Sequence, residues 1–367
     1  MKIVRGVLKA FAALVALVAI ALGIWALLPA KTAPIPGEHA IAAIERIELG
    51  GVPQTMLLRG RDVRNPLLLY LHGGPGGAQM SLAPFYSGEL ERHFVVVHWD
   101  QRGAGASCQG VDPATLSLDR IVEDAIELAS ALRARFGQPI VLLGHSWGSL
   151  VGVRAVQRRP DLFSAYVGVG QLVSLKRNEE LSYQWVLDEA KRRRESDALA
   201  ELEAIGPPPY ADSEELGVQR EYLMRWGGSI HDFRRARAAL PAFLFGREYS
   251  LATRARFFGC FNRSIDRLWG SIQAIDLMSE VPRLEVPVVL LIGRADYNTP
   301  WELTAEWAQQ LSAPKLEVVW FDGIGHFLPV EDRDAFQRTL IERVLPLAAR
   351  TEPAHSISAL PASSVRP

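Results

Sequence analysis

Gly144-His145-Ser146-Trp147-Gly148 reads G-x-S-x-G and decides the fold of this chain. The residues before it, 139–143, are apolar and partly β-branched, which predicts a buried strand. Residues 149–156 can form a helix until Pro160 stops it. A strand, a tight turn and a helix in this order form a nucleophile elbow, which exposes a serine hydroxyl above the end of a strand. The alternative reading of the motif alone is a structural glycine turn.

Two glycine-rich loops follow predicted strands on the N-terminal side of this motif. Residues 67–71 are apolar and run into His72-Gly73-Gly74-Pro75-Gly76-Gly77, and residues 94–99 run into Asp100-Gln101-Arg102-Gly103-Ala104-Gly105. Continuous apolar strands are typical of parallel sheets with both faces covered. The chain therefore predicts an α/β fold with a mostly parallel central sheet and helices on both faces. Its other predicted elements are a hairpin over 41–49 and 52–58, strands over 165–169, 286–292 and 316–321, and helices over 118–136 and 331–348.

Three polar residues follow predicted strands in the order serine, acid, histidine. Ser146 follows the elbow strand, Asp296 follows the 286–292 strand and His326 follows the 316–321 strand. A serine hydroxyl needs a base to become nucleophilic, and the base needs a carboxylate that fixes its tautomer. We therefore expect a catalytic triad. Asp322 is a rival acid, but it lies only four residues before the histidine; Asp100 precedes the serine, which is the wrong order.

The 72–77 loop has a chemical use beside such a serine. Without β-carbons, its backbone can approach a substrate carbonyl and donate an N–H to the developing oxyanion. Pro75 has no N–H, which leaves Gly74 as the expected donor. Trp147 begins the helix after the serine, and its N–H is the expected second donor.

Together these motifs resemble the prolyl aminopeptidases and their close relatives of the α/β-hydrolase fold. The resemblance covers residues 47–347 and includes H-G-G-P-G-G, D-Q-R-G-x-G-x-S, G-x-S-W-G-S, G-R-x-D and G-H. It implies a peptidase that releases N-terminal residues through an acyl-enzyme on Ser146. It also implies the same triad and the oxyanion donors Gly74 and Trp147.

One part of the family pattern is altered. These enzymes carry a Trp-Glu pair in a helical cap, where the glutamate helps to hold the free α-ammonium group of the substrate. The counterpart here is Trp226-Gly227-Gly228, without an acid after the tryptophan. Trp226 and Glu221 are the candidate substrate-binding residues, with Glu214 and Glu215 as other acids that could substitute.

These residues are compatible with three classes of function. The first is a serine aminopeptidase, and the second is a carboxylesterase or lipase-like hydrolase that uses the same triad on esters. The third is a non-catalytic ligand-binding protein, which the intact triad and oxyanion glycines disfavour. No cofactor is expected. There is neither C-x-x-C nor H-E-x-x-H, so no metal site is expected either.

Length, composition and charge indicate the domain organisation and limit the expected partners. With 367 residues and 49% hydrophobic residues the chain can bury a large core. A formal net charge of -1 argues against a nucleic-acid partner. We expect a hydrolase core over 41–171 and 278–349 and a helical cap inserted over 172–277. A linker over 31–40 precedes the core, and a disordered tail over 350–367 follows it.

The N-terminus predicts contact with a membrane. Residues 10–28 are apolar and uncharged and would form a helix about 28 Å long, close to the thickness of a bilayer core. Lys2, Arg5 and Lys9 precede this run and favour a cytoplasmic N-terminus. We therefore expect a single-pass anchor over residues 1–30 in the cytoplasmic membrane, with the catalytic domain on its far side. The alternative is a cleaved signal peptide and a secreted or periplasmic protein.

The chain has two cysteines, Cys108 and Cys260. The first follows the 94–99 strand and the second lies in the predicted cap. We expect two unrelated buried thiols. The alternative is a disulfide between core and cap in an oxidising compartment.

Overall fold

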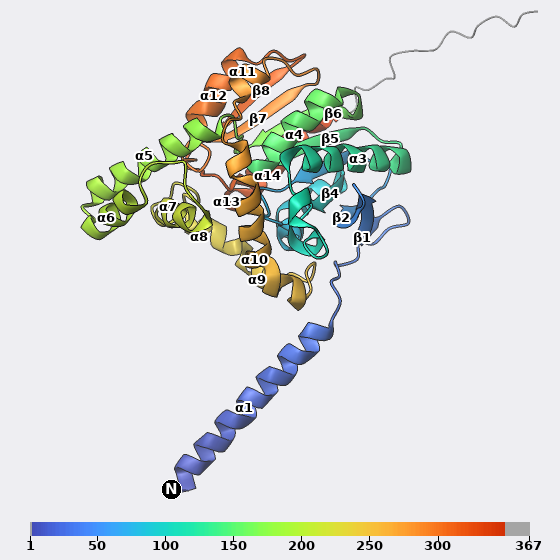
Figure 1. The fold of residues 1–367 in the computed structure, drawn as a ribbon. Coiled ribbons are helices and arrows are strands. Elements are labelled where there is room, and N and C mark those ends of the chain that lie inside the picture. The colour runs from blue at the N-terminus through green and yellow to red at the C-terminus, as the bar shows by residue number, and fades with distance from the viewer. Residues whose placement is uncertain (1, 349–367) are drawn as a thin grey trace, which may run out of the picture.

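The structure is a computed structural model that describes residues 2–348 of the chain. The tail over 350–367, which the sequence predicts to be disordered, lies outside the described residues. Within them, the chain forms one central sheet, helices on both of its faces, and a group of helices inserted between two strands (Figure 1).

The sheet has eight strands in the order β1-β2-β4-β3-β5-β6-β7-β8. Strands β1 and β2 form an antiparallel hairpin, β2 pairs antiparallel with β4, and every other neighbouring pair is parallel. The predicted α/β-hydrolase fold is confirmed. The strands are β1 (Ile41–Leu49), β2 (Val52–Gly60), β3 (Leu67–Leu71), β4 (Val95–Asp100), β5 (Ile140–His145), β6 (Phe163–Val169), β7 (Val288–Gly293) and β8 (Leu316–Phe321).

Successive residues of the central strands enter two different cores. Leu67, Leu69 and Leu71 of β3 belong to one apolar cluster, whereas Leu68 and Tyr70 belong to another. The first cluster is covered by α3 (Leu118–Phe136), α4 (Trp147–Arg158) and α12 (Trp301–Gln310). The second is covered by α2 (Ala83–Ser87), α14 (Arg333–Thr339) and α15 (Leu345–Ala348). Burial on both faces explains why these strands are apolar throughout.

The chain between β6 and β7 is helical, and we call residues 172–277 the cap. In Figure 1 its first three helices extend to one side of the sheet, whereas α10 returns across the domain. Its helices are α5 (Leu175–Arg193), α6 (Ser196–Ile205), α7 (Ser213–Arg225), α8 (Phe233–Ala236), α9 (Leu240–Phe245) and α10 (Leu251–Leu268), and α11 (Leu277–Glu280) leads back to the sheet.

The last predicted helix is broken in the structure. Instead of one helix over 331–348, the chain forms α13 (Leu328–Glu331), α14, a π-helical turn over Leu340–Val344, and α15. Asp332 accounts for the break after α13, because its side chain accepts the N–H of Ala335 and caps α14.

The apolar run near the N-terminus forms a helix, α1 (Lys2–Leu27), which projects from the domain (Figure 1). A membrane-spanning helix needs about 20 consecutive, predominantly apolar residues. Within the described part of the chain, no helix has the combined length and apolar character to cross a membrane. This finding overturns the prediction of an anchor that contacts the bilayer through residues 10–28. The predicted placement of the protein in or beyond the cytoplasmic membrane is corrected with it.

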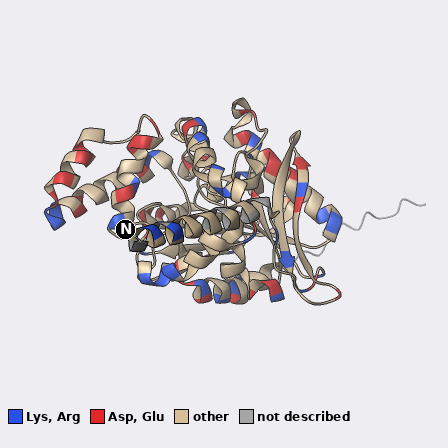
Figure 2. Ribbon diagram, turned by 90° about the horizontal axis from the view of Figure 1, so that it is seen from below, with Lys and Arg blue, Asp and Glu red and all other residues tan. Residues whose placement is uncertain are grey.

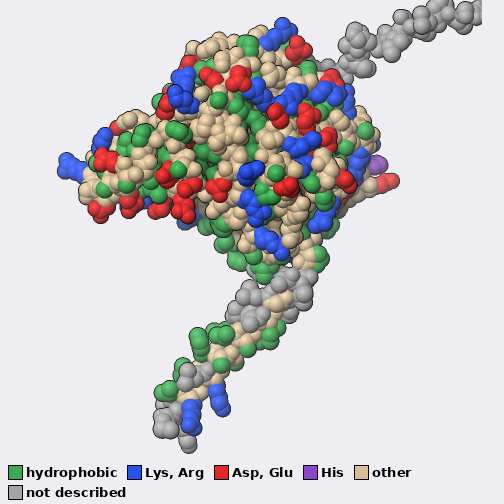
Figure 3. Space-filling model, viewed as in Figure 1, with side chains coloured by type: hydrophobic (Ala, Val, Ile, Leu, Met, Phe, Trp, Pro, Cys, Tyr) green, Lys and Arg blue, Asp and Glu red, His purple; other side chains and the backbone are tan. Residues whose placement is uncertain are grey.

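Charges of both signs are interspersed over the helices (Figure 2). Exposed apolar side chains gather instead over α9, at the edge of the domain that faces α1 (Figure 3). Leu240, Phe243, Leu244 and Phe245 of α9 are all more than 40% exposed.

Candidate active site

Ser146 stands at the sharp turn between β5 and α4. Its φ of 56° is uncommon for a residue with a side chain. The N–H of Ser146 donates to Val169 O over 2.9 Å, which fixes the turn against β6. A β-carbon at Gly148 would collide with Leu71 O, and one at Gly144 would collide with Gly148 O. The two glycines thus allow helix and strand to approach closely, which is the geometry of a nucleophile elbow.

Asp296 and His326 form a buried hydrogen-bonded pair. His326 Nδ1 lies 2.8 Å from Asp296 Oδ2, and both side chains are at most 3% exposed. Asp296 also accepts the N–H of Asn298 at 2.9 Å and both the N–H and the hydroxyl of Thr299 at 2.8 Å. These donors hold the carboxylate so that it accepts Nδ1–H of His326. His326 Nε2 then keeps a lone pair that can accept a proton.

Gly74 and Trp147, the expected oxyanion donors, line the same cavity as Ser146. A β-carbon at Gly74 would approach the nitrogen atoms of Gly76 and Gly77 to 2.5 Å, so only glycine fits at its φ of +125°. The indole of Trp147 donates to Gln101 Oε1 at 2.9 Å, and the Gln101 side chain donates to His72 O at 3.0 Å. These bonds fix the 72–77 loop relative to the first turn of α4.

Two buried histidines beside this loop are held neutral. Nδ1–H of His72 donates to Gly73 O at 2.7 Å, and burial lowers the pKa of His72 to about 4. Nε2–H of His145 donates to His326 O at 3.0 Å, and their ring centroids are 4.8 Å apart. Burial, and next the charge that His326 can carry, lower the pKa of His145 to about 3. Both rings therefore support the site without adding charge to it.

Ser146, His326, Gly74 and Trp147 line one cavity of about 340 Å³ between the core and the cap. Asp296 lies behind His326 and does not line it. The structure thus brings together the residues that the sequence selects for a triad and an oxyanion hole. Their catalytic roles stay predictions.

Comparison with known proteins identifies the family. Residues 68–339, most of the chain, match the sequence pattern of the Alpha/beta hydrolase family. The chain belongs to the alpha/beta hydrolase family.

Individual relatives agree with this assignment. The hydrolase is 32% identical over 309 residues to the probable aminopeptidase YbaC of Bacillus subtilis (strain 168), across 83% of this chain and 97% of that protein. It is 25% identical to a putative carbamate hydrolase RutD of Stutzerimonas stutzeri (strain A1501), across 78% of this chain and 95% of that one. The fold matches a proline iminopeptidase-related protein from Thermus thermophilus with a TM-score of 0.59 and 24% identity, across 84% and 99% of the two chains. The predicted resemblance to this branch, and a hydrolase activity, are confirmed.

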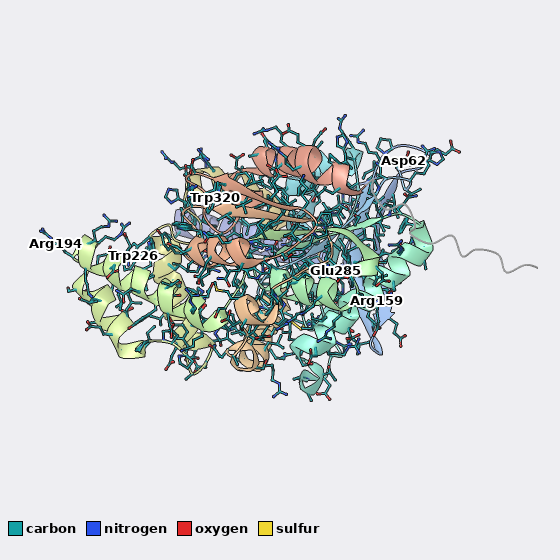
Figure 4. All side chains as sticks on the ribbon, turned by 90° about the horizontal axis from the view of Figure 1, so that it is seen from above. Asp62, Arg159, Arg194, Trp226, Glu285 and Trp320 are labelled. Carbon is teal, nitrogen blue, oxygen red and sulfur yellow. A yellow bond between two sulfur atoms is a disulfide. The ribbon has the colours of Figure 1, made fainter. Side chains whose placement is uncertain are left out.

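Trp226 and Glu221 of this hydrolase, the candidate substrate-binding residues, do not line the cavity that contains Ser146. The Trp226 ring packs inside the cap against Tyr222, and its Nε1–H lies 3.3 Å from Glu195 Oε1. Figure 4 shows Trp226 among the cap helices at one end of the molecule, on the same side as Arg194. The side chain of Glu221 is exposed.

Glu179 of α5 is the acid that the cap places in the cavity, and sequence analysis missed it. Its side chain is fully buried. Oε1 accepts from Arg220 at 2.6 Å and from Asn178 at 2.9 Å. Among the described residues, none donates a hydrogen bond to Oε2. The one signal in the sequence is that Glu179 occupies the buried stripe of α5, four residues after Leu175 and three before Ser182.

Cys108 and Cys260 form a disulfide with Cα atoms 6.1 Å apart, which corrects the expectation of two separate thiols. The bond joins the loop after β4 to α10. The two cysteines are 152 residues apart, and only the path of the cap brings α10 over that loop. Phe261 and Ile265 of α10 line the cavity, so the disulfide holds one of its walls.

Proposed function

We propose that this hydrolase acts through an acyl-enzyme on Ser146. The Ser146 hydroxyl attacks the substrate carbonyl while His326 Nε2 takes its proton, and Asp296 stabilises the charged ring. The N–H groups of Gly74 and Trp147 stabilise the oxyanion. His326 then returns the proton to the leaving group, and water hydrolyses the acyl-enzyme by the same route. The hydrogen-bonded Asp296–His326 pair beside the strained Ser146 turn carries this proposal.

We further propose that the substrate is a peptide or amide with a free α-ammonium group. The relative from Bacillus subtilis is named a probable aminopeptidase. Glu179 offers a buried carboxylate oxygen in the same cavity as Ser146, and among the described residues that oxygen has no donor. A buried carboxylate is stabilised by a cationic partner, and an ammonium group supplies both charge and N–H donors.

Ester hydrolysis is the second candidate. Leu172, Leu175, Leu216, Phe261 and Ile265 give the cavity an apolar lining suited to an acyl chain. Arg220 also neutralises much of the charge of Glu179. An ester substrate would use the same triad but would not need the free oxygen of Glu179.

The nucleophile is tested with a fluorophosphonate probe, which labels an activated serine covalently. We expect the full-length wild type to be labelled and Ser146→Ala to be unlabelled. Equal labelling of both proteins would refute the assignment of Ser146.

The substrate class is tested with Glu179→Gln on a panel of aminoacyl-naphthylamides and p-nitrophenyl esters. If Glu179 holds an ammonium group, kcat/KM for the naphthylamides should fall roughly 10–100-fold, as expected for the loss of a charge-assisted hydrogen bond. Activity on the esters should not change. Glu180→Gln, at the next and exposed position of α5, is the matched control. Equal losses on both substrate types would argue against an ammonium site at Glu179.

A further inference from the structure

The acid and the base come from separate loops, and the cap holds both of them. The N–H of Tyr297, the residue after Asp296, donates to Gly228 O of the cap at 2.8 Å. The N–H of His326 donates to the next cap carbonyl, Ser229 O, at 2.7 Å. Two successive cap carbonyls thus accept from the acid loop after β7 and the base loop after β8.

Glu331 ties the same cap segment to the base loop a second time. Its Oε1 accepts the N–H of Gly325 at 3.1 Å, directly before His326. Its Oε2 accepts the N–H groups of His231 at 2.8 Å and Asp232 at 3.2 Å. Glu331 is only 3% exposed, so these bonds are formed away from water.

A stacked pair of rings supports the acid side. The rings of Trp185 of α5 and Tyr297 are 4.7 Å apart and nearly parallel, at 17°. Trp185 also lies against Gly228, where a β-carbon would approach its ring to 2.7 Å. The cap helix, the cap carbonyl and the residue after Asp296 therefore form one packed unit.

We propose that residues 228–232 of the cap are a clasp that sets the distance between Asp296 and His326, with Glu331 and Trp185 as positioning residues. The two loops follow different strands, and the 2.8 Å bond between Asp296 and His326 requires them to stay in register. A misplacement of about 1 Å near a reacting group can cost on the order of 10²-fold in rate. The segment after Trp226 thus supports the acid–base pair, and its Ser229 also lines the cavity.

The clasp goes beyond the proposed function, although its kinetic test rests on His326 acting as the base. A second readout is independent of any activity. The Nδ1 proton that His326 donates to Asp296 should give a low-field proton resonance, and its loss reports directly on that hydrogen bond.

The base side is tested with Glu331→Gln, because the amide cannot accept from both the cap and the base loop. On p-nitrophenyl acetate we expect kcat to fall roughly 10–100-fold while KM is retained, since Glu331 does not line the cavity. The low-field resonance should broaden or disappear while the protein stays folded, as thermal unfolding would show. Glu203→Gln, the same change at an exposed cap position, should alter neither kcat nor the resonance.

The acid side is tested with Trp185→Ala and its conservative partner Trp185→Phe. The alanine variant should have a lower kcat and should lack the resonance. The phenylalanine variant, which can still stack on Tyr297, should retain both the kcat and the resonance of the wild type. This pair of variants tests the clasp even if Glu331→Gln does not fold.

The clasp is refuted if the folded variants differ from the wild type only in a lower melting temperature, or have a higher KM with kcat unchanged. If Ser146→Ala keeps full activity, the proposed function fails, and the resonance alone decides the clasp.

Discussion

At the scale of single residues, the acid–base pair leaves no space for a side chain at Gly170. A β-carbon there would lie 2.8 Å from His326 Nδ1 and 3.3 Å from Asp296 Oδ2. Gly170→Ala should therefore displace His326 and lower kcat on the order of 10²-fold, the loss expected for a shift of about 1 Å. Steady-state kinetics on the best substrate of the panel measures this loss.

Gly137→Ala is the matched control for this change. Gly137 ends α3 with φ +65°, close to the +52° of Gly170, but a β-carbon at Gly137 would have no atom within 4 Å among the described residues. It therefore shares the backbone strain without touching the site. We expect a lower melting temperature and an unchanged kcat. Equal losses of kcat in the two variants would contradict the contact with His326.

The residues of the site differ in how far sequence can predict them. The placement of Ser146, Asp296 and His326 in one site follows from local patterns, because each stands just after an apolar strand and parallel strands end at one edge. Glu179 has no such local pattern, because it is one of many glutamates on amphipathic helices. Its partner Arg220 lies on another helix, and only packing shows that the pair faces the cavity.

At the scale of elements, the disulfide between Cys108 and Cys260 restrains the cap helix α10. Joining residues 152 apart restricts the unfolded chain strongly, and such a bond contributes about 2–5 kcal/mol. Reduction of the folded protein should therefore lower its melting temperature by roughly 4–10 °C. A thermal scan with and without dithiothreitol measures the shift.

The control is the double variant Cys108→Ala with Cys260→Ala, which should melt like the reduced wild type in both conditions. Denatured wild type prepared without reductant should show no free thiol. Two free thiols per chain, or no effect of dithiothreitol on the wild type, would contradict a stabilising disulfide.

Elements of the sheet could be predicted more fully than those of the cap. A strand buried on both faces is apolar at every position, so β3 could be placed to the residue at 67–71. A cap helix shows an apolar stripe, but the stripe does not say which neighbour it meets. The structure shows that the ring of Trp226 packs inside the cap and that the chain after it contacts the loops of Asp296 and His326.

At the scale of the whole molecule, buried titratable groups have opposite effects on how the free energy of unfolding depends on pH. Burial lowers the pKa of His72 to about 4 and those of His98 and His145 to about 3, from an ordinary 6.5. Above pH 6.5 such a histidine is neutral in both the folded and the unfolded chain. As the pH falls below 6.5, the histidine takes up a proton in the unfolded chain but not in the folded one, so the free energy of unfolding decreases. Burial raises the pKa of Asp100 to about 7, so its contribution falls as the pH rises from about 4 to 7.

Because these groups act in opposite directions, the contribution of one histidine is best measured as the difference in unfolding free energy between the wild type and a variant that lacks that histidine. His98 is buried, away from the cavity, with Nε2 3.0 Å from Ser87 Oγ. Relative to His98→Gln, the wild type should lose up to about 1.4 kcal/mol of unfolding free energy per pH unit as the pH falls from 6.5 towards 4. Urea unfolding at several pH values measures the difference.

His39→Gln, at an exposed position, is the control, and its effect on the unfolding free energy should stay within about 0.5 kcal/mol at every pH. A difference at position 98 that does not vary with pH would mean that His98 keeps its proton affinity on folding, which contradicts its burial as a neutral ring.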